Sequence, residues 1–94
     1  MFDIQKRTDG SIVLKGRLDA AQAPRIQEFV AAAEGNTIVD FSELEYISSA
    51  GLGQMVALHQ KLARSGSTLT LTGMNQQVRY VFHLARLDTI LKIE

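Results

Sequence analysis

The sequence predicts an α/β fold: a mixed, mostly parallel β-sheet with an N-terminal hairpin and three or more crossover helices. Its length of 94 residues allows one domain, residues 1–94. Apolar residues make up 46% of the chain, and their spacing changes repeatedly between a two-residue period and a period of three to four. Such alternation of strands and helices is typical of a parallel sheet joined by right-handed crossovers.

The first segments favour two antiparallel strands. Phe2 and Ile4 alternate with polar residues, Asp9-Gly10 supplies a turn signal, and the two-residue period resumes over residues 12–18. We therefore expect a β-hairpin at the start of the chain.

A helix and a central strand are expected next. Apolar residues recur at helical spacing, Pro24 fits the first turn, and Gly35 can end the helix. Residues 37–41 then form a short apolar run with little alternation, which indicates a strand covered on both faces. Because sites in parallel sheets lie beyond the carboxyl ends of the strands, the loops after Leu18 and Phe41 are the places to search.

The second half of the chain continues the alternation. A helical stripe runs from Ser49 to Ser65, alternating Leu and Thr at 68–72 indicate a strand, and Asn75 can cap a third helix. Residues 90–93 are expected to form the last strand. The predicted order is thus a hairpin followed by α-β-α-β-α-β.

Composition excludes several classes of function. Ten basic and ten acidic residues are interspersed and give a formal charge of zero, so neither nucleic acid nor an anionic membrane is an expected partner. Without Cys there is no thiolate nucleophile or cysteine zinc site, and His59 and His83 lack partners at ligand spacing, so we expect no metal. No signal peptide or apolar span is recognisable, which favours a cytoplasmic protein without membrane insertion.

The informative pattern lies in residues 40–53. Ser48 and Ser49 stand where a helix begins, and Gly51 and Gly53 follow in its next turn. Gly costs about 1 kcal/mol relative to Ala inside a helix, so the missing side chains must allow close approach of the protein's own sheet or of a partner. The pattern fits a capping Ser with tight packing, or a phosphate held at the helix start. It does not fit a nucleotide-binding P-loop, which ends in Lys-Ser/Thr.

The same residues carry a family resemblance. The stretch from Asp40 to Gly53 resembles the signature of the STAS family, which sulphate transporters and bacterial anti-sigma factor antagonists share: a strand ending in Asp-Phe-Ser, an apolar pair, a Ser-containing turn and Gly-Leu-Gly. Residues 16–19 are similar to the family's G-x-L-D, and residues 75–78 open the expected late helix. The resemblance extends over essentially the whole chain.

For a stand-alone member, the resemblance implies an anti-sigma factor antagonist that is a partner switch, not an enzyme, and that needs no cofactor. The unphosphorylated form would bind and sequester an anti-sigma factor serine kinase, phosphorylation of Ser49 would release it, and a metal-dependent serine phosphatase would restore binding. Ser48, in place of a frequent Asp, is the alternative acceptor. Asp19 matches an Asp near the phosphorylation site and also suits the N-cap of the first helix. The expected partner-binding residues are Asp19, Ser48, Ser49, Ala50, Gly51, Leu52 and Gln54.

Two other functions compete with the switch. A non-switching STAS subunit of a larger complex, such as a lipid transporter, would use Ser49 only as a helix cap. Nucleotide hydrolysis would have only the Gly-rich turn in its favour.

Overall fold

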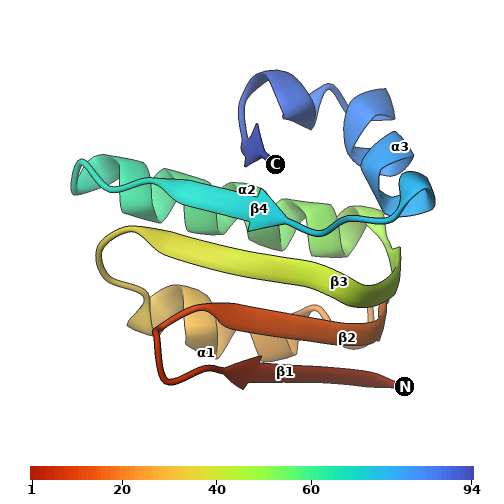
Figure 1. Cartoon of the computed structure of the whole chain (residues 1–94), viewed down its shortest axis with the longest axis horizontal. Coiled ribbons are helices and arrows are strands. Elements are labelled where there is room, and N and C mark those ends of the chain that lie inside the picture. Colours follow the sequence, from red (N-terminus) through yellow and green to blue (C-terminus); the bar gives the residue numbers. More distant parts are fainter.

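The computed structural model describes all residues from Met1 to Glu94 and forms one five-stranded sheet with helices behind it (Figure 1). The elements are β1 (Phe2–Lys6), β2 (Ile12–Leu18), α1 (Pro24–Ala32), β3 (Thr37–Ile47), α2 (Ser49–Arg64), β4 (Leu69–Thr72), α3 (Gln76–Leu84), the 3-10 turn η1 (Leu87–Thr89) and β5 (Lys92–Ile93). The predicted order of elements is confirmed.

The sheet has the strand order β1-β2-β3-β4-β5, in which β1 and β2 are antiparallel and all other neighbours are parallel. From β2 onward each new strand is added on the same side of the previous one. Right-handed crossovers that always advance in one direction place their helices on one face of the sheet. Figure 1 accordingly shows α1 and α2 behind the strands and no helix in front of them.

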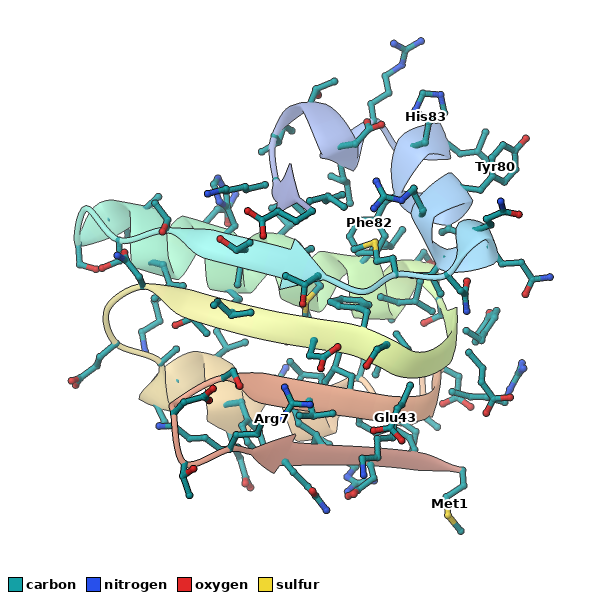
Figure 2. All side chains as sticks on the ribbon, in the orientation of Figure 1. Met1, Arg7, Glu43, Tyr80, Phe82 and His83 are labelled. Atoms are coloured by element: carbon teal, nitrogen blue, oxygen red, sulfur yellow. The ribbon has the colours of Figure 1, made fainter.

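The uncovered face corrects the prediction of a central strand buried on both sides. Val39 is 1% exposed, but its neighbour Ile38 is 49% exposed, because only one face of β3 meets the helices. The side chains of Arg7 and Glu43 also lie on the open face (Figure 2). β3 is central in the sheet, as expected, but one of its faces is buried against the helices and the other is exposed to solvent.

β3 is also much longer than the predicted strand, so no loop follows Phe41. Two register shifts against β2 each add one residue to β3, one after Asp40 and one after Leu44. Burial follows these bulges: Phe41, Leu44 and Ile47 are buried at spacings of three, where a regular strand would alternate in twos. The bulged strand thereby extends to Ile47 and ends directly before α2.

The core lies between the sheet and the helices. Phe41 of β3 and Phe82 of α3 are fully buried, with ring centroids 5.8 Å apart in an edge-to-face contact. Asn75 caps α3 as predicted, because its Oδ1 accepts a hydrogen bond of 2.8 Å from the Val78 amide. Its amide group donates to the carbonyl oxygen of Leu44 at 3.1 Å, which fastens the start of α3 to β3.

None of the helices combines the length and the apolar character that crossing a bilayer requires. No three His, Asp or Glu side chains are grouped in a way that would hold a metal ion.

Candidate functional site

The site begins where the carboxyl ends of β2 and β3 lie side by side. Leu18 pairs with Ile47 at the end of the ladder, and the Ser48 amide donates a hydrogen bond of 2.9 Å to the Leu18 carbonyl oxygen. The loop that follows β2, which starts at Asp19, is therefore a neighbour of the first turn of α2. The structure brings together the two segments that the sequence singled out.

The two serines at the start of α2 have different environments. Ser48 has the extended backbone of an N-cap, and its hydroxyl accepts a hydrogen bond of 3.2 Å from the Gly51 amide. Ser49 is the first residue of the helix, is exposed, and its hydroxyl makes no hydrogen bond within the chain. The capping interpretation thus applies to Ser48, and the Ser49 hydroxyl is available for chemistry.

The electrostatics of this helix end suit an added negative charge. The first turn of α2 contains no acidic residue, and its last turn contains Lys61 and Arg64. The N-terminus of a helix carries free amides and the positive end of the helix dipole. Nothing within the helix opposes a phosphate on its first residue.

Asp19 lies in the adjacent loop but does not cap α1. Its Oδ1 accepts a hydrogen bond of 3.1 Å from the Gln22 amide, and its carbonyl oxygen accepts one of 3.0 Å from the Ala23 amide. The N-cap position of α1 is Ala23, which has no side-chain cap. The N-cap prediction for Asp19 is therefore wrong: an additional turn separates it from the helix, because α1 starts only at Pro24.

The two glycines of the signature serve different purposes. Gly51 is buried, and a Cβ there would stand 2.7 Å from Cγ1 of Ile47 and 2.9 Å from Cγ of Leu18. Gly53 is exposed, and a Cβ there would meet no atom within 4 Å. Close packing on the protein's own sheet explains Gly51, whereas nothing inside the domain requires Gly at position 53.

The buried face of α2 also corrects the list of expected contact residues. Leu52 is 8% exposed and belongs to the hydrophobic core, and Gly51 lies against the sheet beside it. Both residues therefore lie beneath the exposed surface of the site, on the buried face of α2, and offer little surface to a partner. On the outer side of the first two turns, Ser49 and Gly53 are exposed, while Ala50 and Gln54 are half-buried.

An exposed aromatic and cationic pair at this edge escaped the sequence analysis. The Arg17 guanidinium lies 4.4 Å from the ring centroid of Tyr46, across the ladder from it. Arginine and tyrosine are among the residues that contribute most to protein interfaces. Both residues lie within the recognised motifs, but the bulge that sets Arg17 opposite Tyr46 has no signal in the sequence.

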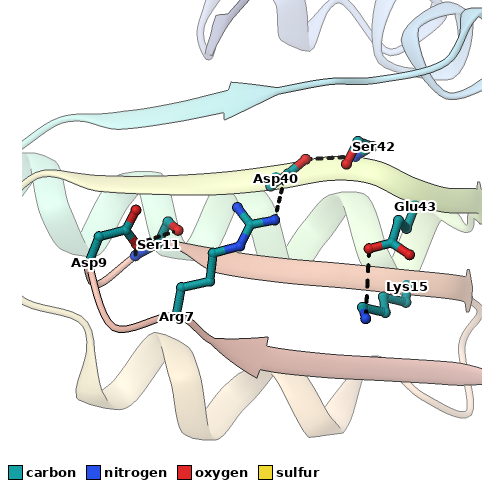
Figure 3. Close-up of polar contacts among 7 residues, drawn as sticks. All are labelled: Arg7, Asp9, Ser11, Lys15, Asp40, Ser42 and Glu43. Carbon is teal, nitrogen blue, oxygen red and sulfur yellow. Dashed lines mark hydrogen bonds and ion pairs between the residues drawn. The ribbon is translucent and has the colours of Figure 1, made fainter.

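Asp40 holds a backbone amide within β3, away from the start of α2. Its Oδ1 accepts a hydrogen bond of 2.8 Å from the Ser42 amide, and its Oδ2 accepts one of 2.8 Å from Nη2 of Arg7 (Figure 3). Partial burial by itself raises the pKa of Asp40, but the contacts with Ser42 and Arg7 outweigh it and hold the pKa below its ordinary value. The carboxylate thus stabilises the bulge of β3 and has a structural role.

The histidines offer no metal site. His83 lies on the outer side of α3 (Figure 2), and its Nδ1 is 2.8 Å from Oδ2 of Asp88. His59 is on α2, a different helix.

Comparison with known proteins places the whole chain among related sequences. A family model described as "Mlab, STAS domain" matches residues 2–92. The anti-sigma-B factor antagonist of Listeria monocytogenes is 30% identical over 87 residues, which cover 88% of this chain and 76% of that protein.

Solved structures agree with the fold. The structure of a candidate anti-sigma factor antagonist from Thermotoga maritima has a TM-score of 0.80 at 25% identity and covers 99% of this chain and 85% of that one. The anti-sigma factor antagonist SpoIIAA in its unphosphorylated form has a TM-score of 0.72 at 19% identity, covering 100% and 87% of the two chains. The phosphorylated form of SpoIIAA, a Bacillus cell fate determinant, has a TM-score of 0.71 at 20% identity, covering 100% and 91%.

Proposed function

This chain belongs to the STAS domain family, among the anti-sigma factor antagonists, and we propose that it works as a phosphorylation-controlled partner switch. Its relatives are non-enzymatic regulators. In the proposed cycle the unphosphorylated protein binds and sequesters an anti-sigma factor that is also a serine kinase. Phosphorylation of Ser49 releases this partner, and a metal-dependent serine phosphatase restores binding, all in the cytoplasm.

The observation that carries the proposal is the difference between the two serines. Ser49 is exposed with a free hydroxyl, whereas the Ser48 hydroxyl is occupied by the Gly51 amide. A kinase that modified Ser49 would leave the helix cap intact. A kinase that modified Ser48 would have to break it, so the geometry favours Ser49 as the acceptor.

A phosphate at this position is compatible with the fold. The helix N-terminus stabilises a negative charge on its first residue, and no acidic side chain of the first turn repels it. SpoIIAA has nearly the same similarity to this chain in its phosphorylated and unphosphorylated forms. This supports a switch that changes the surface and leaves the domain folded.

The release step follows from charge. A phosphoserine adds about 1.5 to 2 negative charges to a chain whose formal charge is zero. Within a fitted, desolvated interface, a misplaced like charge costs several kcal/mol, which lowers the affinity by more than about a hundredfold. One modification is then sufficient to release the partner.

The contact surface of the switch comprises the outer side of the first turns of α2 and the neighbouring loop. Ser49 and Gly53 would meet the partner directly, and Asp19, Ala50 and Gln54 would border them. Because Gly53 has no atom near its missing side chain, a backbone segment of the partner can approach α2 closely there.

Purified protein incubated with each anti-sigma factor kinase of its source organism and ATP tests the proposal. Mass spectrometry should find the phosphate on Ser49, and phosphate on another residue with Ser49 unmodified would refute the assignment. The Ser49→Ala variant should bind the kinase as the wild type does, whereas Ser49→Asp should bind at least tenfold more weakly. Ser67→Asp, just beyond the opposite end of α2, is the charge control and should bind normally.

The competing function, a non-switching subunit of a larger complex such as a lipid transporter, assigns Ser49 the role of a helix cap. In the structure Ser48 has that role, which leaves the Ser49 hydroxyl without a structural task. This difference favours the switch. Co-purification with a transporter ATPase, and with no anti-sigma factor, would reverse the choice.

A further inference from the structure

β1 is an outer edge of the sheet, and Figure 1 shows no element beyond it. The Met1 carbonyl oxygen accepts a hydrogen bond of 2.9 Å from the Arg17 amide of β2. Backbone groups along an antiparallel strand point alternately toward and away from the neighbouring strand, so Phe2, Ile4 and Lys6 direct theirs away from β2. An edge of this kind is a template on which a further strand can pair.

One group on this edge is already occupied by a side chain of α1. Nη1 of Arg25 donates a hydrogen bond of 2.8 Å to the Phe2 carbonyl oxygen. Nη2 of the same guanidinium is 3.9 Å from Oδ1 of Asp3, and the guanidinium lies 5.3 Å from the ring centroid of Phe2. Gln22 accepts a further bond from Nη1 at 3.3 Å and so helps to hold the guanidinium in place. Arg25 therefore covers the first outward acceptor of the strand.

We propose that the outer edge of β1 is a self-association surface that Arg25 keeps closed. Without the Arg25 guanidinium, β1 pairs antiparallel with β1 of a second copy. The proposal concerns the edge of the sheet opposite to β5 and does not depend on phosphorylation of Ser49.

The chemistry of the strand selects both the occupant and the register. Outward-directed residues must meet outward-directed residues, which a two-fold axis at Ile4 achieves by pairing Ile4 with Ile4 and Phe2 with Lys6 of the second copy. Asp3 then faces Gln5, and no like charges are opposed. A shift toward the N-terminus would set Asp3 against Asp3, which is unfavourable, and a shift toward the C-terminus would leave Phe2 unpaired.

In the favoured register, Arg25 blocks the pairing directly. The Phe2 carbonyl oxygen would have to accept the Lys6 amide of the second copy, but Arg25 already donates to it. Because of the two-fold axis the obstruction occurs twice, once at each end of the new ladder. The charged guanidinium also stands where the second backbone would lie.

Arg25→Met tests the proposal, because Met preserves an apolar stem beside Phe2 and removes the donor and the charge. Arg64→Met, an exposed Arg of α2 without a hydrogen bond or ion pair, is the matched control. In analytical ultracentrifugation the wild type and the control should be monomers and the variant a dimer. Hydrogen exchange of the Ile4 amide, which points outward in the monomer, should slow by about tenfold or more in the variant alone.

Two further variants make the outcome decisive. Adding Ile4→Pro to Arg25→Met removes the outward Ile4 amide and should restore the monomer. If Arg25→Met fails to fold by circular dichroism, Arg25→Gln, whose shorter neutral side chain also loses the contact, replaces it. A folded variant that stays monomeric, a dimer whose Ile4 amide still exchanges fast, or a wild-type dimer paired through Ile4 would each overturn the proposal.

Discussion

A Cβ on Gly51 would stand 2.9 Å from Cγ of Leu18, because the first turn of α2 crosses directly over the end of β2. Real Cβ atoms do not approach other carbon atoms so closely, and Ile47 would be even nearer, at 2.7 Å. The close contact fixes the height of the helix above the sheet. It therefore also fixes where Ser49 lies relative to the loop at Asp19.

Gly51→Ala should destabilise the domain by about 1 to 3 kcal/mol, because the overpacking of Leu18 and Ile47 exceeds the gain in helix propensity. Urea unfolding monitored by circular dichroism measures the change. Ala57→Gly, farther along the same helix, shows the propensity effect alone and should cost no more than about 1 kcal/mol. Equal stability of Gly51→Ala and wild type would mean that α2 sits higher above the sheet than described.

Ser48→Ala should lower the free energy of unfolding by about 1 kcal/mol, because it removes the acceptor for the Gly51 amide. Ser49→Ala should change stability by less than about 0.5 kcal/mol, as an exposed residue without a hydrogen bond does. Both values come from chemical denaturation of the two variants in parallel. The opposite ranking would transfer the cap to Ser49 and leave the switch without its structural basis.

The sequence predicts where the helices and strands of this fold lie better than it predicts which of their faces are buried. Asp9-Gly10 and Asn75 carry local chemistry, a tight turn and a helix cap, and each acts as expected. Whether residues 37–41 are covered on one face or two depends on the strand order, which no local pattern encodes. The strands β2 to β5 follow one another across the sheet in a single direction. Once this order is known, right-handed crossovers require every helix to lie on the same face of the sheet.

For the candidate site, the limits of prediction are geometric. The motif located Ser48, Ser49 and Asp19 near one another, and the hydrogen bond between Ser48 and Leu18 agrees with this. The burial of Leu52 depends on how α2 packs on the sheet. The exposure of Glu43 and Glu45 on either side of a buried Leu44 depends on two bulges in β3. A bulge changes which face each later residue occupies, so its position must be known before a surface can be assigned.

Asp40 makes stability depend on pH in the acid range. Its pKa is lowered in the folded protein, so its contribution is fully present above the unfolded value of about 3.8 and is lost as the pH falls through the folded pKa. Asp40→Asn should cost about 1 kcal/mol at neutral pH and less with increasing acidity. Unfolding midpoints of the two proteins at several pH values below 5 measure the convergence. If the difference between the two midpoints stays constant over that range, titration of the Asp40 carboxylate does not contribute to the pH dependence of stability.

Gly16 should tolerate no side chain. Its backbone has φ of 85°, and a Cβ would lie 1.9 Å from the Met1 carbonyl oxygen, which pairs with the Arg17 amide. Gly16→Ala should therefore release the start of β1 and cost more than about 2 kcal/mol. In the variant the Arg17 amide should exchange its hydrogen faster than in the wild type, which would show that its hydrogen bond to the Met1 carbonyl oxygen is lost. Gly10→Ala shares the positive φ but has no neighbour within 4 Å, so it separates backbone strain from the clash.

Gly53→Ala should have opposite effects on the free domain and on its complex. The free domain should gain up to about 1 kcal/mol, because position 53 is helical, exposed and without any neighbour that a methyl group would strike. If the anti-sigma factor brings a backbone segment against this turn of α2, the same methyl group should weaken binding by about tenfold. Unfolding and isothermal titration calorimetry on one preparation measure both quantities. If Gly53→Ala increases the stability of the free domain and leaves the affinity for the partner unchanged, the partner does not contact α2 at position 53.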